Sequence, residues 1–295
     1  MKTTRRIVFA LLLGGFCSCN YLDIVPDNIA TIDNAFVSRN MAEKFLFTCY
    51  SYFPDRDNLQ SDPAFFGGDG SWYYTTSEAL NIARGNQNVV SPYVNYWDGL
   101  NQGKPLYRGI RDCNIFLEKI HDVPDLDDFE KERWIAEVNF LKAYFHFYLL
   151  RMYGPIPIVD ENLPISSGTE AVKVERQHVD TCFNYIVDLL DRAAAGLPET
   201  IELDATEAGR VTKPVALAMK ARILVYAASP LFNGNPDYAG FMGYGGKPLF
   251  SPQYSAEKWE RAADACREAI ELCHATGNQL FYWQPNKPGL SDTTI

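Results

Sequence analysis

The segment 128–152 places the strongest constraint on the fold. Apolar residues recur along it at alternating steps of four and three, the spacing of one face of an α-helix. They are Trp134, Val138, Leu141, Phe145, Tyr148 and Met152. A second apolar row, formed by Phe140, Tyr144 and Phe147, predicts a helix that neighbours cover on two faces. Gly154 and Pro155 follow and indicate its end.

Other segments with helical periodicity surround this one. Helices are expected at 31–53, 106–120, 177–195, 213–228 and 256–277. Thr212 and Pro214 suit a helix start, and Gly196 followed by Pro198 suits a helix end. Residues 155–159 read as extended chain, but no pattern of a central strand occurs. The sequence therefore predicts an all-α fold.

The last two expected helices form a pair. Small residues on the second, namely Ala262, Ala263, Ala265 and Ala269, allow close packing against the first, as in a tetratricopeptide-type hairpin. Residues 229–254 replace the short turn of such a hairpin and hold six aromatic residues among glycines and prolines. These rings either pack the insertion down or present a surface. The predicted architecture is a set of tetratricopeptide-like antiparallel hairpins with long irregular loop insertions.

The N-terminus has the form of a secretory leader. Lys2, Arg5 and Arg6 precede an apolar run at 7–16, which at about ten residues is too short to span a bilayer. Small residues then lead to Cys19, whose position after the expected cut is that of the lipid-modified cysteine of bacterial lipoproteins. We expect 1–18 to be removed and Cys19 to carry a lipid anchor. The alternative is an ordinary signal peptide with Cys19 as a bystander.

The net charge and the cysteine content argue against some classes of ligand and site. The chain has a net charge of −10, and removal of a leader with three basic and no acidic residues takes it to −13. Such a charge opposes binding to nucleic acid. Apart from Cys17 and Cys19 there are five widely spaced cysteines without a C-x-x-C motif, so neither a zinc nor a thioredoxin-like site is supported.

Motifs of catalysis are not evident. The four histidines form no H-E-x-x-H motif, and neither a G-x-S-x-G elbow nor a phosphate-binding loop occurs. His146 lies within the apolar helix and is assigned to the core. Two acidic stretches, 55–58 and 122–128, lack the spacing of an EF-hand and are assigned to solvated surface. We expect no catalytic residue, no metal and no cofactor.

An ordered series of motifs resembles the SusD/RagB family of nutrient-binding lipoproteins of Bacteroidetes. The motifs are CNYLD at 19–23, LQSD at 59–62, YRGIRDCN at 107–114, EVNFLKAYFHF at 137–147, YGPIP at 153–157, GRVTK at 209–213, AMKAR at 218–222 and AASPL at 227–231. They cover nearly all of the chain after the leader. Family members continue beyond the point where this chain stops, so the resemblance implies that 19–295 is an N-terminal helical portion.

The resemblance also implies a function. It indicates a lipid-anchored outer-membrane protein that faces the cell exterior and covers a SusC-like TonB-dependent transporter. Its expected cargo is an oligosaccharide, with peptides possible. Capture would break no bond. A surface glycoside hydrolase and a tetratricopeptide-type protein-binding scaffold remain the alternative readings.

Sugar binding needs flat aromatic rings beside amide and carboxylate groups. The irregular stretch 54–105 supplies both, and loops of that length are often functional. The candidate ligand-binding residues are Trp72, Tyr73, Tyr74, Tyr96, Trp97, Asp98 and Asn101. The alternative for these rings is burial against the helices. Trp134 and Trp259 occupy helical core positions and are assigned to packing.

Overall fold

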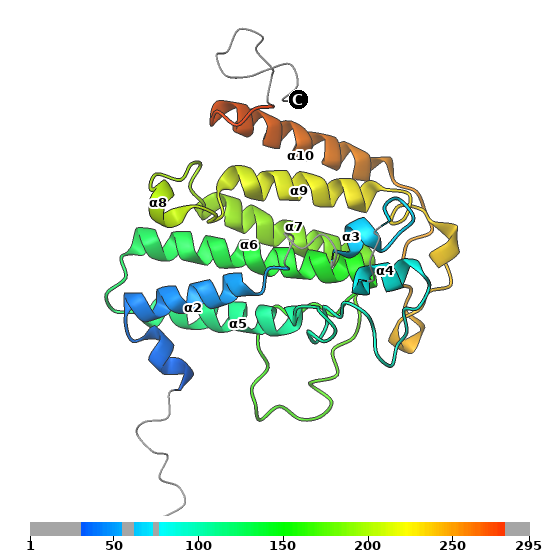
Figure 1. Ribbon diagram of the computed structural model, residues 1–295, viewed down its shortest axis with the longest axis horizontal. Coiled ribbons are helices and arrows are strands. Elements are labelled where there is room, and N and C mark those ends of the chain that lie inside the picture. Colours follow the sequence, from blue (N-terminus) through cyan, green and yellow to red (C-terminus); the bar gives the residue numbers. More distant parts are fainter. Residues whose placement is uncertain (1–30, 55–61, 73–76, 281–295) are drawn as a thin grey trace, which may run out of the picture.

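The computed structural model describes residues 31–54, 62–72 and 77–280. Helices dominate it, and the described residues contain no strand, only an isolated bridge between Met242 and Pro248. The α-helices are α2 (Arg39–Ser51), α3 (Pro63–Phe66), α4 (Glu78–Ala83), α5 (Leu106–Lys119), α6 (Asp128–Tyr153), α7 (Val179–Gly196), α8 (Asp204–Glu207), α9 (Lys213–Ala228) and α10 (Ala256–Ala275) (Figure 1). The predicted all-α class is confirmed.

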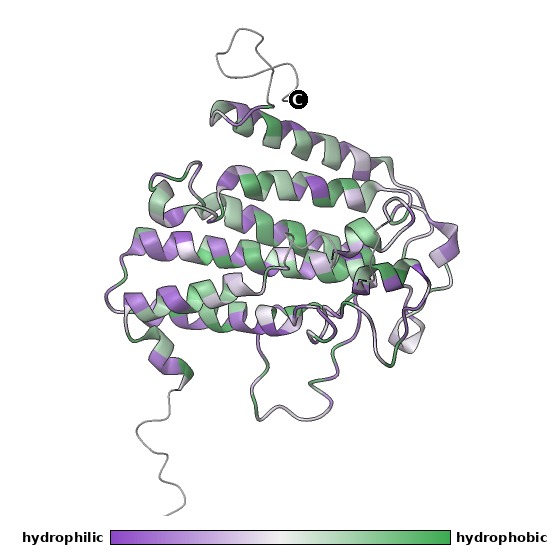
Figure 2. Cartoon of the chain, viewed as in Figure 1, coloured by the Kyte–Doolittle hydropathy of each residue, from purple (hydrophilic) through white to green (hydrophobic). Residues whose placement is uncertain are grey.

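Helix α6 is the central element. Its start is capped by the Asp127 carboxylate, which accepts a hydrogen bond from the backbone N–H of Glu130 at 2.9 Å. It ends at Gly154, whose φ of 68° is readily adopted only by glycine. From Ala136 to Leu150 every residue is buried, because α5 lies along one side and α7 along the other. The predicted coverage on two faces is therefore confirmed, and the first turns of α6 are mainly hydrophilic (Figure 2).

The helices follow one another as antiparallel neighbours. In Figure 1, α5, α6, α7, α9 and α10 lie side by side, each running against the one before it. Ala262, Ala265 and Ala269 of α10 are buried where this helix packs on α9, as the small-residue pattern predicts. Ala263 is instead exposed, because it lies on the opposite side of α10. This stacking of hairpins is the tetratricopeptide-like arrangement.

Two segments differ from the sequence expectation. The stretch 31–53 breaks into a 3-10 turn, Ile32–Phe36, and α2, because Ser38 is extended between them. The irregular stretch contains the short helices α3 and α4. Asp62 caps α3 through the Ala64 N–H at 2.9 Å, and Ser77 caps α4 through the Leu80 N–H at 3.1 Å. Helices this short have too few residues for a periodic pattern.

Two of the three residues that the sequence analysis assigned to the core are buried. Trp134 is fully buried, and His146 is also fully buried, so both core assignments are confirmed. The assignment of Trp259 to packing is wrong, since 42% of the side chain is exposed. Trp259 belongs to α10, which packs on α9 on one side only, so a helical position that is apolar need not be covered.

The insertion 229–254 packs down through some of its rings and exposes others. Phe232 and Phe250 are buried and stack nearly parallel, and Tyr238 stacks on Phe250 with ring centroids 4.7 Å apart. Tyr244 and Tyr254 are exposed. Both alternatives of the sequence analysis therefore apply within one insertion.

Two further observations concern all the described residues together. Of the helices in the described part, none combines the length and apolar character that crossing a membrane requires. The five described cysteines are free thiols, and Cys49, Cys113 and Cys182 are buried.

Candidate functional site

A cleft of about 470 Å³ opens beside the C-terminal end of α6. One wall comes from the loop between α4 and α5, and the other comes from the last residues of α6. The residues that line it are Gln87, Asn88, Val89, Pro92, Asn95, Trp97, Asp98, Met152 and Tyr153. Two of the sequence-predicted residues, Trp97 and Asp98, are therefore brought together in one cleft.

The loop that carries Trp97 is held by its own hydrogen bonds. The Asn95 side-chain oxygen accepts from the backbone N–H of Trp97 at 2.9 Å, which is an Asx turn. Gly99 has a φ of 89°, and a Cβ at Gly103 would overlap the carbonyl oxygen of Asn95. Both positions therefore require glycine. The loop has one tightly determined conformation.

The backbone at Val94 adds strain to this loop. Its φ of 49° is an outlier for a β-branched residue, and such conformations persist only where the surroundings impose them. The N–H of Val94 donates to the carbonyl oxygen of Asn101 at 3.0 Å, which closes the loop across its base. Backbone strain beside a cleft is common in binding sites, and here it presets the position of Trp97.

The Trp97 indole is half-buried and clamped by aromatic neighbours. Its centroid lies 4.7 Å from that of Tyr107, and 5.6 Å from that of Tyr153 in an edge-to-face contact at 85°. The guanidinium carbon of Arg176 lies 6.0 Å from the indole centroid. Arg176 is itself fixed, because it donates to the carbonyl oxygens of Tyr153 and Pro155. The ring thus lines the cleft in a fixed orientation.

The other predicted residues of this loop have different positions. Asp98 is exposed, and its carboxylate accepts from the Leu100 N–H at 3.2 Å. Asn101 uses its amide N–H groups on the loop itself, donating to the carbonyl oxygen of Pro92 and the hydroxyl of Ser91. Asn101 therefore shapes the loop and does not line the cleft.

Tyr96 lies inside the core. Only 4% of the residue is exposed, and its ring meets that of Tyr148 at a centroid distance of 4.6 Å. Burial raises the pKa of the Tyr96 hydroxyl far above its usual range. Tyr96 is buried because consecutive side chains of this loop point in different directions, so that Trp97 lines the cleft while Tyr96 faces the core.

Of the second predicted cluster, the structure describes only Trp72. Trp72 is 65% exposed, with the guanidinium carbon of Arg84 5.8 Å from its ring centroid, and it is not among the lining residues. Tyr73, Tyr74 and the lipidation candidate Cys19 lie outside the described residues.

Sequence reasoning missed several lining residues. The Gln87 side-chain oxygen accepts from the Tyr93 N–H at 2.7 Å, and the Asn88 side-chain oxygen accepts from the Ser91 N–H at 2.8 Å, so loop contacts hold both amides where the residues line the cleft. The three consecutive amide residues Asn86, Gln87 and Asn88 were the sequence signal that could have predicted a polar wall of the cleft. Tyr153 ends the central helix, and only the tertiary structure shows that its ring reaches the cleft.

The acidic stretches have structural roles where they are described. Asp125 accepts from the backbone N–H of Arg39, and Asp127 caps α6. Across the described ranges, no three His, Cys, Asp or Glu side chains gather in a manner that suits a metal ion. Residues 55–58 lie outside these ranges.

Comparison with known proteins gives a consistent result. The model of the SusD-like family described as "starch-binding associating with outer membrane" matches residues 20–225. SusD-like protein P25 of Formosa agariphila is 23% identical over 241 residues, which is 76% of this chain and 43% of that protein.

Solved structures agree in fold. The structure named BT4246 is 33% identical, with a TM-score of 0.71 over 86% of this chain and 45% of its own. A SusD-like carbohydrate binding protein of Bacteroides fragilis is 22% identical, with a TM-score of 0.57 over 81% of this chain and 41% of its own. The chain spans less than half the length of these relatives. With the family model matched over most of its residues, this chain belongs to the SusD-like family.

Proposed function

We propose that this protein is a cell-surface lipoprotein that captures an oligosaccharide at the Trp97 cleft and delivers it to a SusC-like TonB-dependent transporter. The observation that carries the binding proposal is the cleft itself, with a clamped indole beside amides and a carboxylate. The family description and the carbohydrate-binding relative support the same ligand class.

The geometry suits a sugar for a physical reason. A pyranose ring has an apolar face and a rim of hydroxyl groups, so it needs a flat ring to stack on and hydrogen-bonding groups at the edge. Trp97 supplies the ring. Gln87 and Asn88 each use one amide N–H on the loop and keep a second as a donor, and the Asp98 carboxylate supplies acceptors. Because these groups are already fixed by the loop, binding orders few side chains.

Capture without cleavage is the mechanism that the cleft supports. Hydrolysis of a glycoside commonly requires two carboxyl groups on either side of the scissile bond. Among the described residues that line the cleft, Asp98 is the single carboxylate. The glycoside hydrolase reading therefore gains no support here, and the proposed role is retention and transfer.

The anchor and the division of the chain belong to the same proposal. The family match begins at residue 20, directly after Cys19, which supports a leader at 1–18 followed by a helical region at 19–295. A lipid on Cys19 would hold the protein at the outer membrane, and we propose that it faces the cell exterior. Delivery to a transporter follows from the family resemblance.

The test is glycan binding by matched variants. Trp97→Ala should weaken retention of an oligosaccharide by about five- to thirtyfold, since loss of one stacked ring removes roughly 1–2 kcal/mol. Trp259→Ala is the control, because it removes an exposed indole from α10, away from the cleft. Circular dichroism should show the same helicity in all three proteins.

Three outcomes would contradict the proposal. Equal retention by Trp97→Ala and wild type would remove the cleft from the binding site. New reducing ends during incubation, abolished by a carboxylate substitution, would make the protein a hydrolase. Failure to retain any member of a glycan panel, with binding to a protein partner unaffected by sugars, would support the scaffold reading.

A further inference from the structure

The segment 161–175, which leads from the end of the central hairpin to α7, projects from the stack of helices and is called the projecting loop below. Figure 1 shows it below α5, on the side of the molecule away from α10. The loop makes turns of its own. The N–H of Ser167 donates to the carbonyl oxygen of Pro164 at 2.9 Å, and that of Ala171 donates to the carbonyl oxygen of Gly168 at 3.0 Å. These bonds give the projection a defined backbone.

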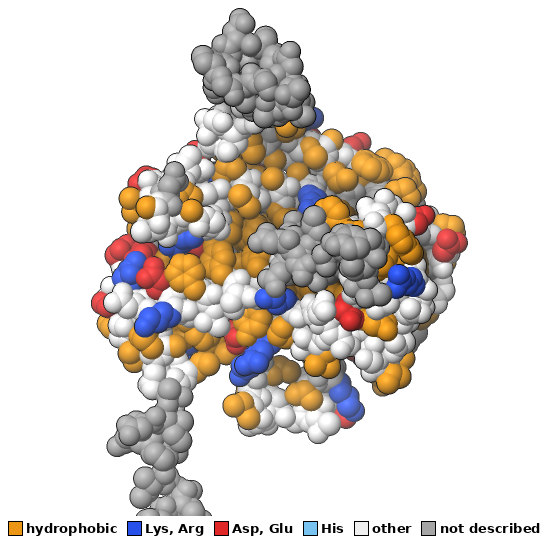
Figure 3. Space-filling view, in the orientation of Figure 1, with side chains coloured by type: hydrophobic (Ala, Val, Ile, Leu, Met, Phe, Trp, Pro, Cys, Tyr) orange, Lys and Arg blue, Asp and Glu red, His pale blue; other side chains and the backbone are white. Residues whose placement is uncertain are grey.

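Four aliphatic side chains of the projecting loop are exposed to solvent. They are Leu163, Ile165, Val172 and Val174, and Ile165 is completely exposed. Figure 3 shows hydrophobic side chains beside charged ones on this loop. A single exposed apolar side chain is ordinary on a protein surface, but several on one projecting segment mark an interaction surface.

The first end of the loop is fixed to three helices. The Asp160 carboxylate pairs with the buried ammonium group of Lys142 in α6 at 3.2 Å, and it accepts from the hydroxyl of Tyr185 in α7 at 2.8 Å. The side-chain amide of Asn162 donates to the carbonyl oxygen of Arg111 in α5 at 3.0 Å. The projecting loop therefore stands on a fixed base.

The second end of the loop lies beside the Trp97 cleft. Arg176, the residue directly after the loop, donates to the carbonyl oxygen of Tyr153 at 3.2 Å, and its guanidinium carbon lies 6.0 Å from the centroid of the Trp97 indole. Glu175 pairs with Lys247 of the insertion 229–254 at 3.3 Å. A protein bound to the loop would therefore lie close to the cleft.

The charge of the projecting loop disfavours a lipid surface as its partner. Glu161, Glu170 and Glu175 outnumber the one basic residue, Lys173, which gives a net charge of −2 (1 − 3). Segments that bind anionic lipid are basic, so such a surface repels an acidic loop. Aliphatic side chains on a fixed base suit the apolar centre of a protein–protein interface instead, and acidic neighbours suit a basic rim on the partner.

We propose that the projecting loop is the contact through which this protein docks on the SusC-like transporter, with Ile165 as its central apolar anchor. The identity of the partner rests on the proposed function, while the loop as a docking surface for a protein stands on its exposed aliphatic side chains and its fixed base. Because that base reaches the Trp97 cleft, docking places a captured oligosaccharide beside the transporter, which is the arrangement that delivery requires.

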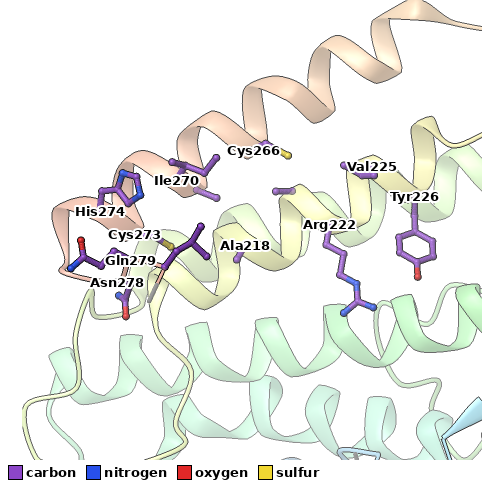
Figure 4. A pocket seen from close by; sticks show the side chains of 13 residues that line it. Ala218, Arg222, Val225, Tyr226, Cys266, Ile270, Cys273, His274, Asn278 and Gln279 are labelled. Carbon is purple, nitrogen blue, oxygen red and sulfur yellow. The ribbon is translucent and has the colours of Figure 1, made fainter. Parts of the chain in front are cut away.

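The first experiment introduces the photo-crosslinking residue p-benzoyl-phenylalanine at Ile165 of the full chain, in the bacterium that produces the protein. Irradiation should link the protein to a TonB-dependent transporter, which mass spectrometry of the linked species identifies. The matched control carries the same group at Ile270, an exposed isoleucine of α10 that lines a groove of about 600 Å³ between α9 and α10 (Figure 4). The control should not link to the transporter. Adducts of position 165 with lipid or other proteins only, or equal linkage from both positions, would overturn the proposal.

The second experiment measures how much transporter is recovered with the protein from detergent-solubilised outer membranes. The variant Ile165→Ser/Val172→Ser should recover at least about tenfold less than wild type, because two apolar contacts are lost. Ile270→Ser should recover the wild-type amount. Neither loop residue lines the Trp97 cleft, so the affinity of the double variant for an oligosaccharide should stay unchanged. Recovery of equal amounts by the double variant and wild type would rule out the loop as the docking surface.

The two measurements also separate this inference from the proposed function. If no member of a glycan panel binds but Ile165 still links to the transporter, oligosaccharide capture fails and the docking surface stands. If glycans bind at the Trp97 cleft but neither experiment responds to changes in the loop, the docking surface fails and glycan capture stands.

Discussion

The hydroxyl oxygen of Tyr153 accepts a hydrogen bond from the backbone N–H of Tyr96 at 2.9 Å. Tyr153 is the last residue of α6, and Tyr96 lies in the loop that carries Trp97. This bond ties the loop to the most buried helix of the protein. The same tyrosine ring contacts the Trp97 indole edge to face, so one residue fixes both the backbone and the ring of the cleft.

Tyr153→Phe should therefore weaken sugar binding without removing a stacking ring. The change leaves the Tyr96 N–H without its acceptor and costs about 1–3 kcal/mol of stability. We expect the affinity for a neutral oligosaccharide to fall several-fold because Trp97 loses its fixed position. Calorimetric binding and urea unfolding measure the two effects. Tyr254→Phe, at an exposed ring of the insertion, is the control and should change neither.

His146 should make the protein less stable in acid. Burial lowers the pKa of its imidazole from 6.5 to about 4, so between these values the unfolded chain binds a proton that the folded chain does not. Stability contributed by the neutral ring is complete above pH 6.5 and falls as the pH drops towards 4. The loss should reach about 3 kcal/mol.

The check on His146 is urea unfolding at pH 7, 5.5 and 4.5. His146→Gln keeps a donor and an acceptor for the Lys142 carbonyl and the Val159 N–H. This variant should be less stable than wild type at pH 7, but its stability should fall less steeply over the same range. An identical pH slope in the two proteins would show that another group titrates.

The buried carboxylate of Glu137 should depend on its arginine partner. Glu137 is fully buried and pairs with Arg210 at 2.8 Å, and the Tyr50 hydroxyl donates to it at 2.7 Å. Arg210→Gln leaves Arg133, at 3.2 Å, as the cationic partner of this buried charge, so the free energy of unfolding should fall by up to about 3–5 kcal/mol. Arg267→Gln breaks an exposed pair and should change it by less than about 1 kcal/mol. Similar losses in both variants would contradict this account.

Cys19 should determine where the protein resides. Cys19→Ala removes the thiol that we propose accepts a lipid, so the protein should move from the membrane pellet to the soluble fraction of an expressing bacterium. Cys17→Ala is the matched control and should remain in the pellet, because its thiol precedes the expected cut. Retention of the Cys19 variant in the pellet would rule out the anchor.

Much of the fold follows from local pattern. The spacing from Trp134 to Met152 predicts a helix buried on two sides, and α6 has that form because neighbours cover its apolar rows. The same neighbours also bury the polar side chains of its middle, which the pattern did not predict. The sequence also predicted the end of α6 at Gly154 and the start of α9 at Pro214, because the backbone preferences of glycine and proline are local properties. Trp259 shows where prediction from periodicity fails, because an apolar residue at a helical spacing is buried only if a neighbouring element covers it.

The sequence by itself determined the helical class, the pairing of the helices and the family motifs, because these depend on the periodicity and conformational preferences of neighbouring residues. Only the tertiary structure decided which aromatic residues line the cleft. Tyr96 and Trp97 are adjacent and alike in type, yet one is buried on Tyr148 and the other lines the cleft with Tyr153. Such contacts join residues that are distant in the chain, so they arise only when the helices and loops pack together.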